Sequence, residues 1–368
     1  MKVIFSSRLF DGIAGGVERM AIAMMNDLTA RGHSIELISL DRADATTFYP
    51  LDPAVEWHRI DIGDANHKAS SQEVWTRLKI IRRIVLNARP DVAIGFQQGA
   101  FFSLAVATLG LGLPVVAAER NAPQRFDHLR DGHGRRFQFE SFRLAKRVAI
   151  QLESYRKHYP RFVQRRIVTI PNPVLQQLQS AAPAGIPKSR KKLLCVARLS
   201  YQKNQDLLIR AFASLAGAFP DWDLILTGGG EDETKLKSLV ENFGLENRVT
   251  FLGAVSDVGP LYLGSHLFCL SSRWEGFPNA LAEAMAYGLP AVGFADCAGV
   301  NELIVPGETG LLAAAGSENL ANVLAELMSD DDRRRRMGGA AKEAVVTFAP
   351  TEVFDRWEEL FLNLAKHP

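Results

Sequence analysis

Segments of strand length and segments of helix length alternate twice along this 368-residue chain, with a proline-containing break between the two series. The first series runs over residues 3–170 and the second over residues 193–294. Because strands separated by helices pair in parallel, the alternation predicts an α/β fold of two Rossmann-like, doubly wound domains. Ligands of such sheets bind beyond the carboxyl ends of the strands, so the loops that follow the strands are the first places to search.

The expected elements follow from the lengths and periods of the apolar runs. The strands are expected at 3–6, 35–40, 92–96, 114–118, 148–151 and 167–170, then at 193–197, 223–227, 249–252, 267–270 and 290–294. The helices are expected at 17–30, 72–88, 100–110, 204–218, 232–243, 278–287, 317–328, 330–347 and 351–365.

The composition changes after Pro171-Asn172-Pro173, where prolines, a glycine and basic residues gather. This change predicts a linker over residues 173–192. It separates an N-terminal domain of residues 1–172 from a C-terminal domain of residues 193–349.

Residues 92–118 carry no charged side chain over 27 positions, which is long enough to span a bilayer. Glutamines, glycines and a proline interrupt the run, so we predict a strand, a helix and a strand instead. The first eight residues lack the apolar run of a secretion signal. Apolar residues make up 47% and charged residues 23%, which excludes a disordered or collagen-like chain. Three cysteines without Cys-x-x-Cys spacing are typical of free thiols in a reducing cytoplasm.

The charge is uneven along the chain. Residues 120–166 hold 13 basic and 4 acidic residues, with phenylalanines among them. Such a segment is either a solvated basic face or a surface for anionic lipid or a lipid diphosphate. Nucleic acid is a weaker interpretation, because no nucleic-acid-binding motif accompanies the segment.

The most specific feature is a pair of carboxylates, Glu275 and Glu283, eight positions apart across an expected helix start. The residues between them begin with Gly276-Phe277-Pro278-Asn279, where glycine allows a turn and proline suits a first helical turn. Backbone amides at such a start attract an anion. On an ideal helix the two glutamates would stand about 12 Å apart, which suits a sugar and a ribose on either side of a diphosphate. The alternative is a helix-dipole acid with an unrelated second glutamate.

Two loops after strands add to this pattern. Arg198 and Lys203 follow the strand expected at 193–197 and could neutralise a diphosphate, or could simply be solvated. Gly15 and Gly16 follow the first strand, where glycines let the backbone approach a ligand.

Together and in this order, these features resemble the retaining nucleotide-sugar glycosyltransferases of the GT-B fold, specifically glycosyltransferase family 4. The resemblance covers nearly the whole chain and is most specific in the second half. There it rests on Arg198, Lys203, Thr227-Gly228-Gly229-Gly230, Phe251-Leu252-Gly253, residues 271–278, residues 283–290, Glu302 and residues 307–312. The Glu-Gly-Phe-Pro-Asn form looks like bacterial enzymes that build surface polysaccharides and lipid-linked oligosaccharides.

The resemblance implies a cleft between an N-terminal acceptor domain, to which the last helix (about 350–368) returns, and a C-terminal donor domain. It implies catalytic roles for Arg198, Lys203 and Glu275, with Arg198 and Lys203 neutralising the leaving diphosphate and Glu275 holding the sugar hydroxyls. The implied donor-binding residues also include Gly15, Gly16, Gly253, Gly276, Phe277, Pro278, Asn279 and Glu283, the last of these on the ribose.

Two positions depart from the family pattern. Many relatives carry a histidine at the end of the strand expected at 114–118, where this chain reads Ala118-Glu119-Arg120-Asn121. Glu119, Arg120 and Asn121 are therefore candidates for the sugar or acceptor site, without assigned roles. Ala197 also replaces a usual glycine.

The resemblance implies retaining transfer of a sugar, expected to be UDP-linked hexose or N-acetylhexosamine, without metal or cofactor. The expected acceptor is a membrane-associated glycan or lipid-linked sugar in polysaccharide, lipopolysaccharide or glycolipid synthesis. The enzyme would work in the cytoplasm at the inner face of the plasma membrane, held there through residues 120–166. The sequence does not indicate an oligomeric state.

Several alternatives stay open. The donor could be a GDP-sugar, the acceptor could be soluble, or the chain could be another kind of nucleotide-sugar enzyme. A two-carboxylate glycosidase is a further alternative, but it needs two carboxyls about 5–10 Å apart, and Glu275 and Glu283 are expected to be farther apart than that. Asp221-Trp222-Asp223 has the spacing of a metal-dependent transferase but precedes its strand. An NAD enzyme is disfavoured because acidic residues follow the triple glycine. His128 and His133 do not have convincing metal-ligand spacing and are interpreted as surface residues. A membrane-binding protein without enzymatic activity would account for the basic segment but not for the motifs of the second half.

Overall fold

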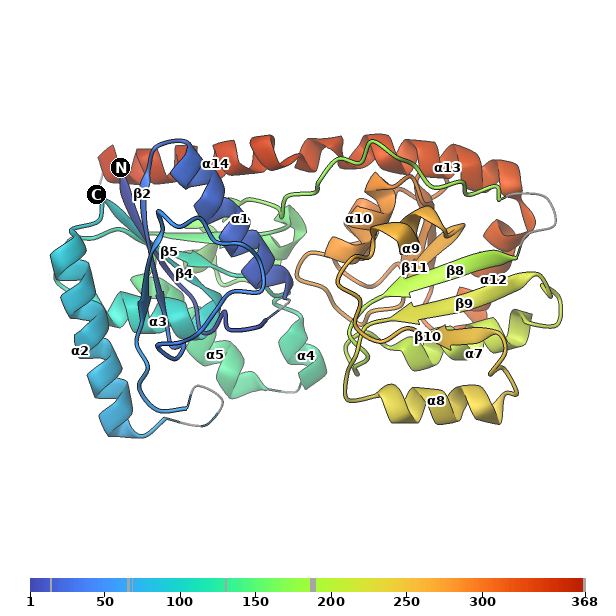
Figure 1. Cartoon of the computed structure of the whole chain (residues 1–368), viewed down its shortest axis with the longest axis horizontal. Helices are drawn as coiled ribbons and strands as arrows, with labels where there is room; N and C mark the ends of the chain where they lie inside the picture. The colour runs from blue at the N-terminus through green and yellow to red at the C-terminus, as the bar shows by residue number, and fades with distance from the viewer. Residues whose placement is uncertain (14, 65–66, 68, 130, 186–189, 367–368) are drawn as a thin grey trace. The chain divides into compact units, whose positions relative to one another are not determined.

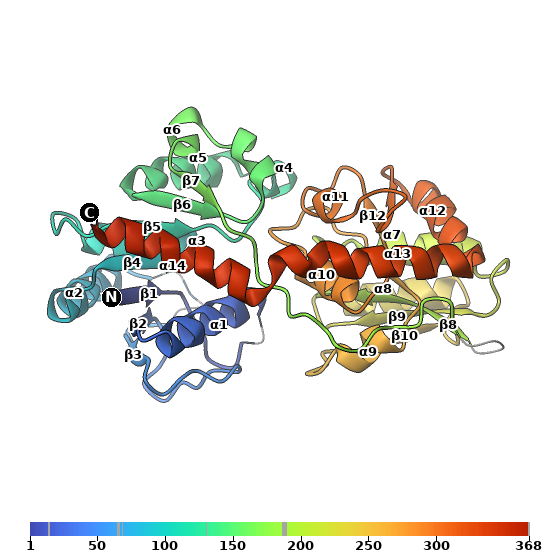
Figure 2. The ribbon, with the colours of Figure 1, turned by 90° about the horizontal axis from the view of Figure 1, so that it is seen from above.

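The computed structural model of the chain describes residues 1–13, 15–64, 67, 69–129, 131–185 and 190–366. It divides into two compact units, which are treated separately below. The first unit comprises residues 1–173 and 350–368, and the second comprises residues 174–349. Figure 1 labels the elements and Figure 2 shows the same chain turned by 90°.

The first unit is built on a parallel seven-stranded sheet in the order β3-β2-β1-β4-β5-β6-β7. Its strands are β1 (Lys2–Ser6), β2 (Ser34–Ser39), β3 (Glu56–Arg59), β4 (Val92–Phe96), β5 (Val115–Ala118), β6 (Arg147–Ile150) and β7 (Ile167–Thr169). Its helices are α1 (Gly16–Ala30), α2 (Ser71–Ala88), α3 (Gln97–Ala107), α4 (Arg125–Leu129), α5 (Gly132–Ser141), α6 (Arg161–Gln164) and α14 (Pro350–Lys366), with 3₁₀ turns at Phe142–Leu144 and Glu153–His158.

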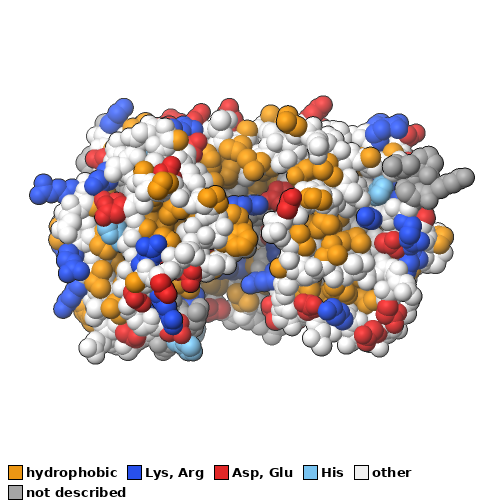
Figure 3. All heavy atoms as spheres, viewed as in Figure 1, with side chains coloured by type: hydrophobic (Ala, Val, Ile, Leu, Met, Phe, Trp, Pro, Cys, Tyr) orange, Lys and Arg blue, Asp and Glu red, His pale blue; other side chains and the backbone are white. Residues whose placement is uncertain are grey.

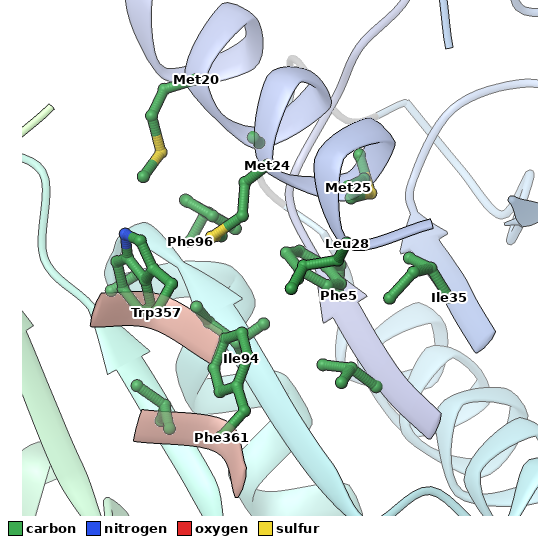
Figure 4. Close-up of a cluster of buried hydrophobic side chains, with 14 of the residues drawn as sticks. Phe5, Met20, Met24, Met25, Leu28, Ile35, Ile94, Phe96, Trp357 and Phe361 are labelled. Atoms are coloured by element: carbon green, nitrogen blue, oxygen red, sulfur yellow. The ribbon is translucent and has the colours of Figure 1, made fainter. Parts of the chain in front are cut away.

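The core of the first unit lies between this sheet and the helices α1 and α14. Trp357 and Phe361 of α14 are fully buried against Phe5 of β1 and Met24 of α1, as Figure 4 shows. The last helix, from the far end of the chain, is therefore an integral part of the N-terminal fold. Burial of such side chains is the main stabilising contribution to a domain of this size.

The second unit has a parallel six-stranded sheet in the order β10-β9-β8-β11-β12-β13. Its strands are β8 (Lys191–Val196), β9 (Trp222–Thr227), β10 (Val249–Phe251), β11 (Leu267–Leu270), β12 (Ala291–Phe294) and β13 (Gly310–Ala313). Its helices are α7 (Gln205–Leu215), α8 (Glu233–Asn242), α9 (Gly259–Leu263), α10 (Asn279–Ala286), α11 (Val300–Leu303), α12 (Ser317–Ser329) and α13 (Asp331–Ala344), followed by a 3₁₀ turn at Val345–Phe348.

The predicted α/β class and the two Rossmann-like sheets are confirmed. Both sheets are parallel, and in each the strand order runs outward in one direction from the first strand, β1 or β8, and then in the other. Residues 92–118 form β4, α3 and β5, as predicted. Among the described residues, no helix combines the length and the apolar character that crossing a bilayer requires. Two strands, β3 and β13, were not expected from the sequence.

The segment expected as a linker is not a free connector over its described part. The Val174 amide donates to the Phe348 carbonyl, and the Ala181 amide donates to the Tyr287 carbonyl. The buried Arg334 of α13 donates to the carbonyl of Pro183 over 2.7 Å. Residues 174–185 therefore belong to the second unit, and residues 186–189 lie outside the described residues.

Candidate active site

The loops after β8, β9 and β10 are bonded to one another at the carboxyl edge of the second sheet. The Gly228 amide donates to the Gly253 carbonyl over 2.7 Å, and the Leu199 amide donates to the Gly229 carbonyl over 3.0 Å. A Cβ on Gly228, where φ is +128°, would stand 2.1 Å from the carbonyl oxygen of Ala197. The triple glycine therefore lets three loops approach closely and form one backbone floor.

An ion pair between Lys203 and Glu275 stands at this edge of the sheet. Lys203 lies between β8 and α7, and its Nζ donates to both carboxylate oxygens of Glu275 over 2.7 and 2.9 Å. The hydroxyl of Ser272, which follows β11, donates to the same carboxylate over 2.5 Å. The Glu275 side chain is 5% exposed and that of Lys203 is 20% exposed. A buried carboxylate needs such partners, whereas the more exposed ammonium can still meet an incoming anion.

The second unit also contains three buried cysteines. Cys195, at the end of β8, has its pKa raised to about 12 by burial. Burial and the negative charge of Glu275 raise the pKa of Cys297. Burial also raises the pKa of Cys269 in β11. The three cysteines are free and buried, as predicted, and their raised pKa values keep the thiols protonated at neutral pH. Cys195 and Cys297 interact electrostatically with Lys203 and Glu275, which the spacing of the cysteines in the sequence does not indicate.

Residues 276–279 lead from Glu275 into α10. Phe277 and Pro278 are buried, and the Phe277 ring packs edge-on against Phe348 with centroids 5.6 Å apart. The positive end of the α10 dipole follows at Asn279. Glu275 lies before the start of α10, and its side chain pairs with Lys203. The separation of about 12 Å between Glu275 and Glu283, which assumes that both stand on one ideal helix, therefore does not apply.

Glu283 lies one turn inside α10 and is partly exposed. Its carboxylate accepts a hydrogen bond from the Tyr262 hydroxyl over 3.2 Å, and the same hydroxyl donates to the Ala280 carbonyl over 3.2 Å. Sequence reasoning missed Tyr262, because its partner Glu283 is 21 positions away and Tyr262 does not lie in a glycine-rich loop. Ser272 lies within residues 271–278, three positions before Glu275, but the sequence analysis assigns it no role of its own.

Arg198 follows β8 and its side chain is exposed. Its carbonyl accepts from the Gln205 amide group over 2.9 Å, which fixes the loop to the start of α7. The structure thus brings together Lys203 and Glu275, while Arg198 extends from the same loop into solvent.

Gly15 and Gly16 belong to the first unit, where Gly15 precedes α1. The carboxylate of Glu18 lies against Gly15, since a Cβ there would stand 1.9 Å from Glu18 Oε2. Burial raises the pKa of Glu18. The Gly-Gly turn therefore packs closely against its own helix.

Glu119 follows β5 in the first unit and is buried. Its carboxylate accepts from the amides of Arg120 and Asn121 over 3.0 and 2.9 Å and from the Gln138 side chain. Arg125 lies 3.5 Å away. Burial raises the pKa of Glu119 despite these partners. This carboxylate closes its own loop and holds α5 against the strand end.

The described residues hold one group with metal-ligand spacing, formed by Glu36, Glu56 and His58 of the first unit. The Glu36 carboxylate already accepts from Lys2 Nζ over 3.0 Å and contacts His58 Nε2 at 2.8 Å. His128 and His133 are exposed, as expected. Within the described ranges, the Lys203–Glu275 site offers a cation and a carboxylate and does not have the side-chain set of a metal centre.

Two family models together account for most of the chain. The model described as "Glycosyltransferase Family 4" matches residues 14–175, and that described as "Glycosyl transferases group 1" matches residues 177–344. A Campylobacter jejuni alpha-1,4-N-acetyl-D-galactosaminyltransferase, acting on a diNAcBac-PP-undecaprenol-linked acceptor, is 24% identical over 95% of this chain and 96% of its own length.

Solved structures share the fold. The sucrose-phosphate synthase of Thermosynechococcus elongatus has a TM-score of 0.85 at 18% identity and full coverage of both chains. Anabaena HepE in complex with UDP-glucose has a TM-score of 0.79 at 21% identity, over 99% of this chain and 100% of that one. On its two sheets, its site motifs and these matches, the chain belongs to the GT-B glycosyltransferases of glycosyltransferase family 4.

Proposed function

We propose that this protein transfers a hexosyl or N-acetylhexosaminyl group from a UDP-sugar to a membrane-associated glycan or lipid-linked acceptor, with retention of anomeric configuration. The observation that carries the proposal is the Lys203–Glu275 pair, held by Ser272 at the carboxyl edge of a Rossmann-like sheet beside the start of α10. A cation, a buried carboxylate and a helix N-terminus in one place suit a sugar diphosphate.

On this proposal the donor roles divide along the site. Lys203 and Arg198 neutralise the leaving diphosphate, and Glu275 accepts hydrogen bonds from the sugar hydroxyls. Glu283 holds the ribose, and the backbone near Gly253 lies against the base. When the diphosphate binds, the Lys203 ammonium interacts with both the diphosphate and the Glu275 carboxylate. Catalysis then depends on positioning and charge stabilisation, and no side chain has to act as a nucleophile.

The acceptor class is inferred from relatives and from the first unit. The names of matched relatives include lipopolysaccharide core mannosyltransferases of two Rhizobium species and an amylovoran biosynthesis glycosyltransferase of Erwinia amylovora. The name of the Campylobacter jejuni relative includes an undecaprenol-linked acceptor. We therefore place this protein in bacterial surface-glycan synthesis, at the inner face of the plasma membrane.

The basic segment 120–166 divides into two groups of side chains. Some brace the fold, such as Arg166, which donates to the carbonyls of Arg143 and Ala145, and Arg125, which donates to Gln138 over 2.7 Å. Others are exposed and could attract anionic lipid: Arg136, Lys146, Lys157, Arg161 and Arg165. Leu129, Phe137 and Leu144 are exposed in the same segment. Figure 3 shows charges of both signs between apolar patches on the viewed face.

The donor assignment is tested by thermal unfolding with millimolar UDP, GDP, ADP or NAD, with and without magnesium. A ligand that binds only the folded chain raises Tm by mass action. We expect a rise with UDP that does not depend on magnesium. A rise with GDP alone would change the donor, and a rise with NAD alone would contradict the assignment.

Membrane attachment is tested by sedimentation with anionic vesicles at low salt. We expect retention that falls with added salt and falls further in a variant with Arg136, Lys146 and Lys157 replaced by Gln. The matched control replaces Lys235, Lys237 and Arg210 of the second unit by Gln. Equal loss in both variants, or no retention of the parent protein, would contradict the membrane proposal.

A further inference from the structure

Three buried polar side chains follow three adjacent strands at the carboxyl edge of the first sheet. Arg120 follows β5, Gln151 follows β6 and Asn172 follows β7, and each side chain belongs to a residue no more than 5% exposed. Arg120 Nη1 donates to Asn172 Oδ1 over 3.2 Å, and Gln151 Nε2 donates to the same oxygen over 2.9 Å. Asn172 therefore ties the other two side chains together at an edge where ligands of parallel sheets bind.

This cluster keeps hydrogen-bonding capacity that the described residues do not use. Arg120 Nε and Nη2 and Gln151 Oε1 are buried and have no partner among the described residues. The neighbouring Glu119 acts on the Arg120 charge electrostatically, but its carboxylate accepts from backbone amides and from Gln138 and forms no hydrogen bond with Arg120 Nε or Nη2. Leaving buried donors unpaired is costly, and most of all on a charged group.

The two unpaired nitrogens form one edge of the guanidinium. That edge presents two parallel N–H groups, which match the two oxygens of a phosphate or a carboxylate. The Trp357 ring, 5.4 Å from the guanidinium carbon, and Asn172 hold the group on its other sides. Burial lowers the pKa of Arg120 to about 10, so the group stays charged at neutral pH.

We infer that the Nε and Nη2 edge of Arg120 binds a phosphate or carboxylate group of a substrate, with Gln151 Oε1 accepting from a neighbouring hydroxyl. The inference rests on the proposed glycosyl transfer for the identity of the substrates. The anion has two possible sources, which are the diphosphate of the donor and an acidic group of the acceptor. In either case Arg120 is a substrate-binding residue contributed by the first unit.

The test compares the full-length protein with the R120K and R120Q variants by ³¹P NMR titration with inorganic phosphate and, separately, with UDP. Lysine keeps the positive charge but lacks the two parallel N–H donors of the guanidinium, whereas glutamine lacks both the charge and these donors. The matched control is R156K, because Arg156 already donates to Glu153 and to the Gln164 carbonyl. Thermal unfolding of each variant shows that it is folded under the conditions of the titration.

We expect the parent protein and R156K to bind phosphate alike, and R120K and R120Q to bind it at least about tenfold more weakly. A parallel loss of UDP affinity identifies the donor diphosphate as the source. Unchanged UDP affinity with weakened phosphate binding identifies an acidic acceptor. Phosphate binding that is absent from the parent protein, or equal in all variants, would overturn the inference and leave Arg120 as a structural contact of Trp357. If UDP fails to bind while phosphate binding depends on Arg120, the donor proposal fails and the anion site remains.

Discussion

The Lys203 ammonium is expected to interact with two negatively charged groups, the Glu275 carboxylate and the donor diphosphate. In the structure it neutralises the buried carboxylate of Glu275, and on the proposed mechanism it also stabilises the negative charge that develops on the leaving diphosphate. A group that acts in both ways contributes to stability and to the transition state, so its removal should be more harmful than removal of the carboxylate.

We therefore expect Lys203→Ala to lower turnover at saturating donor by about 10²–10³, and Arg198→Ala to act in the same direction. Glu275→Gln keeps the shape of the side chain and should cost less. Lys237→Ala, which removes an exposed ion pair with Glu233, is the control and should leave turnover unchanged. Steady-state kinetics check this, and normal turnover in the Lys203 or Arg198 variant would refute the assigned roles.

His266 makes stability depend on pH. It is buried, its Nδ1 accepts from the Lys192 amide over 3.0 Å, and burial together with Arg334 lowers its pKa to about 4 from an ordinary value of 6.5. The unfolded chain therefore binds more protons between these values. The free energy of unfolding should fall by about 3 kcal/mol as pH drops from 6.5 to 4.

Urea unfolding across this pH range measures that slope. His266→Asn keeps an acceptor for the Lys192 amide without a titrating group, so its slope should be shallower over the same interval. Identical slopes in the two proteins would assign the pH dependence to other groups.

At the scale of elements, the sequence predicts what depends on local pattern and misses what depends on partners. The apolar runs at β4, β5 and β11 locate buried central strands within a residue. β3, with the sequence Glu-Trp-His-Arg, lies at the sheet edge and has no apolar run to detect. The Lys203–Glu275 pair joins residues 72 positions apart, so only the packing of β8 beside β11 could reveal it.

The triple glycine gives a matched pair of substitutions. Gly228→Ala places a Cβ 2.1 Å from a backbone oxygen at a φ that alanine rarely adopts, whereas Gly229→Ala meets nothing within 4 Å. We expect Gly228→Ala to destabilise the second unit by more than about 2 kcal/mol and to weaken UDP binding. Chemical unfolding and UDP titration compare the two, and a Gly229→Ala variant that is equally impaired would show that loop flexibility matters more than close approach.

At the scale of the whole molecule, two separate cores stabilise two units. Trp357→Ala removes a large side chain from the first core, where it is fully buried. We expect a loss of about 3–5 kcal/mol that is confined to the first unit. Leu362→Ala, at an exposed position of the same helix, should cost much less. Residue-resolved hydrogen exchange checks this, and equal loss of protection in both units would mean that they unfold as one.

The return of α14 to the first unit also sets an order of events during synthesis. Residues 1–173 leave the ribosome first, but the helix that fills their core follows only after the 176 residues of the second unit. At about 5–20 residues per second, that interval is roughly 9–35 s. Throughout it, the nascent first unit exposes the apolar surface that Trp357 and Phe361 later cover, while the second unit can complete its own core. The N-terminal unit thus completes its core after the second unit has been synthesised, and the growing chain offers chaperones a defined apolar target until α14 follows.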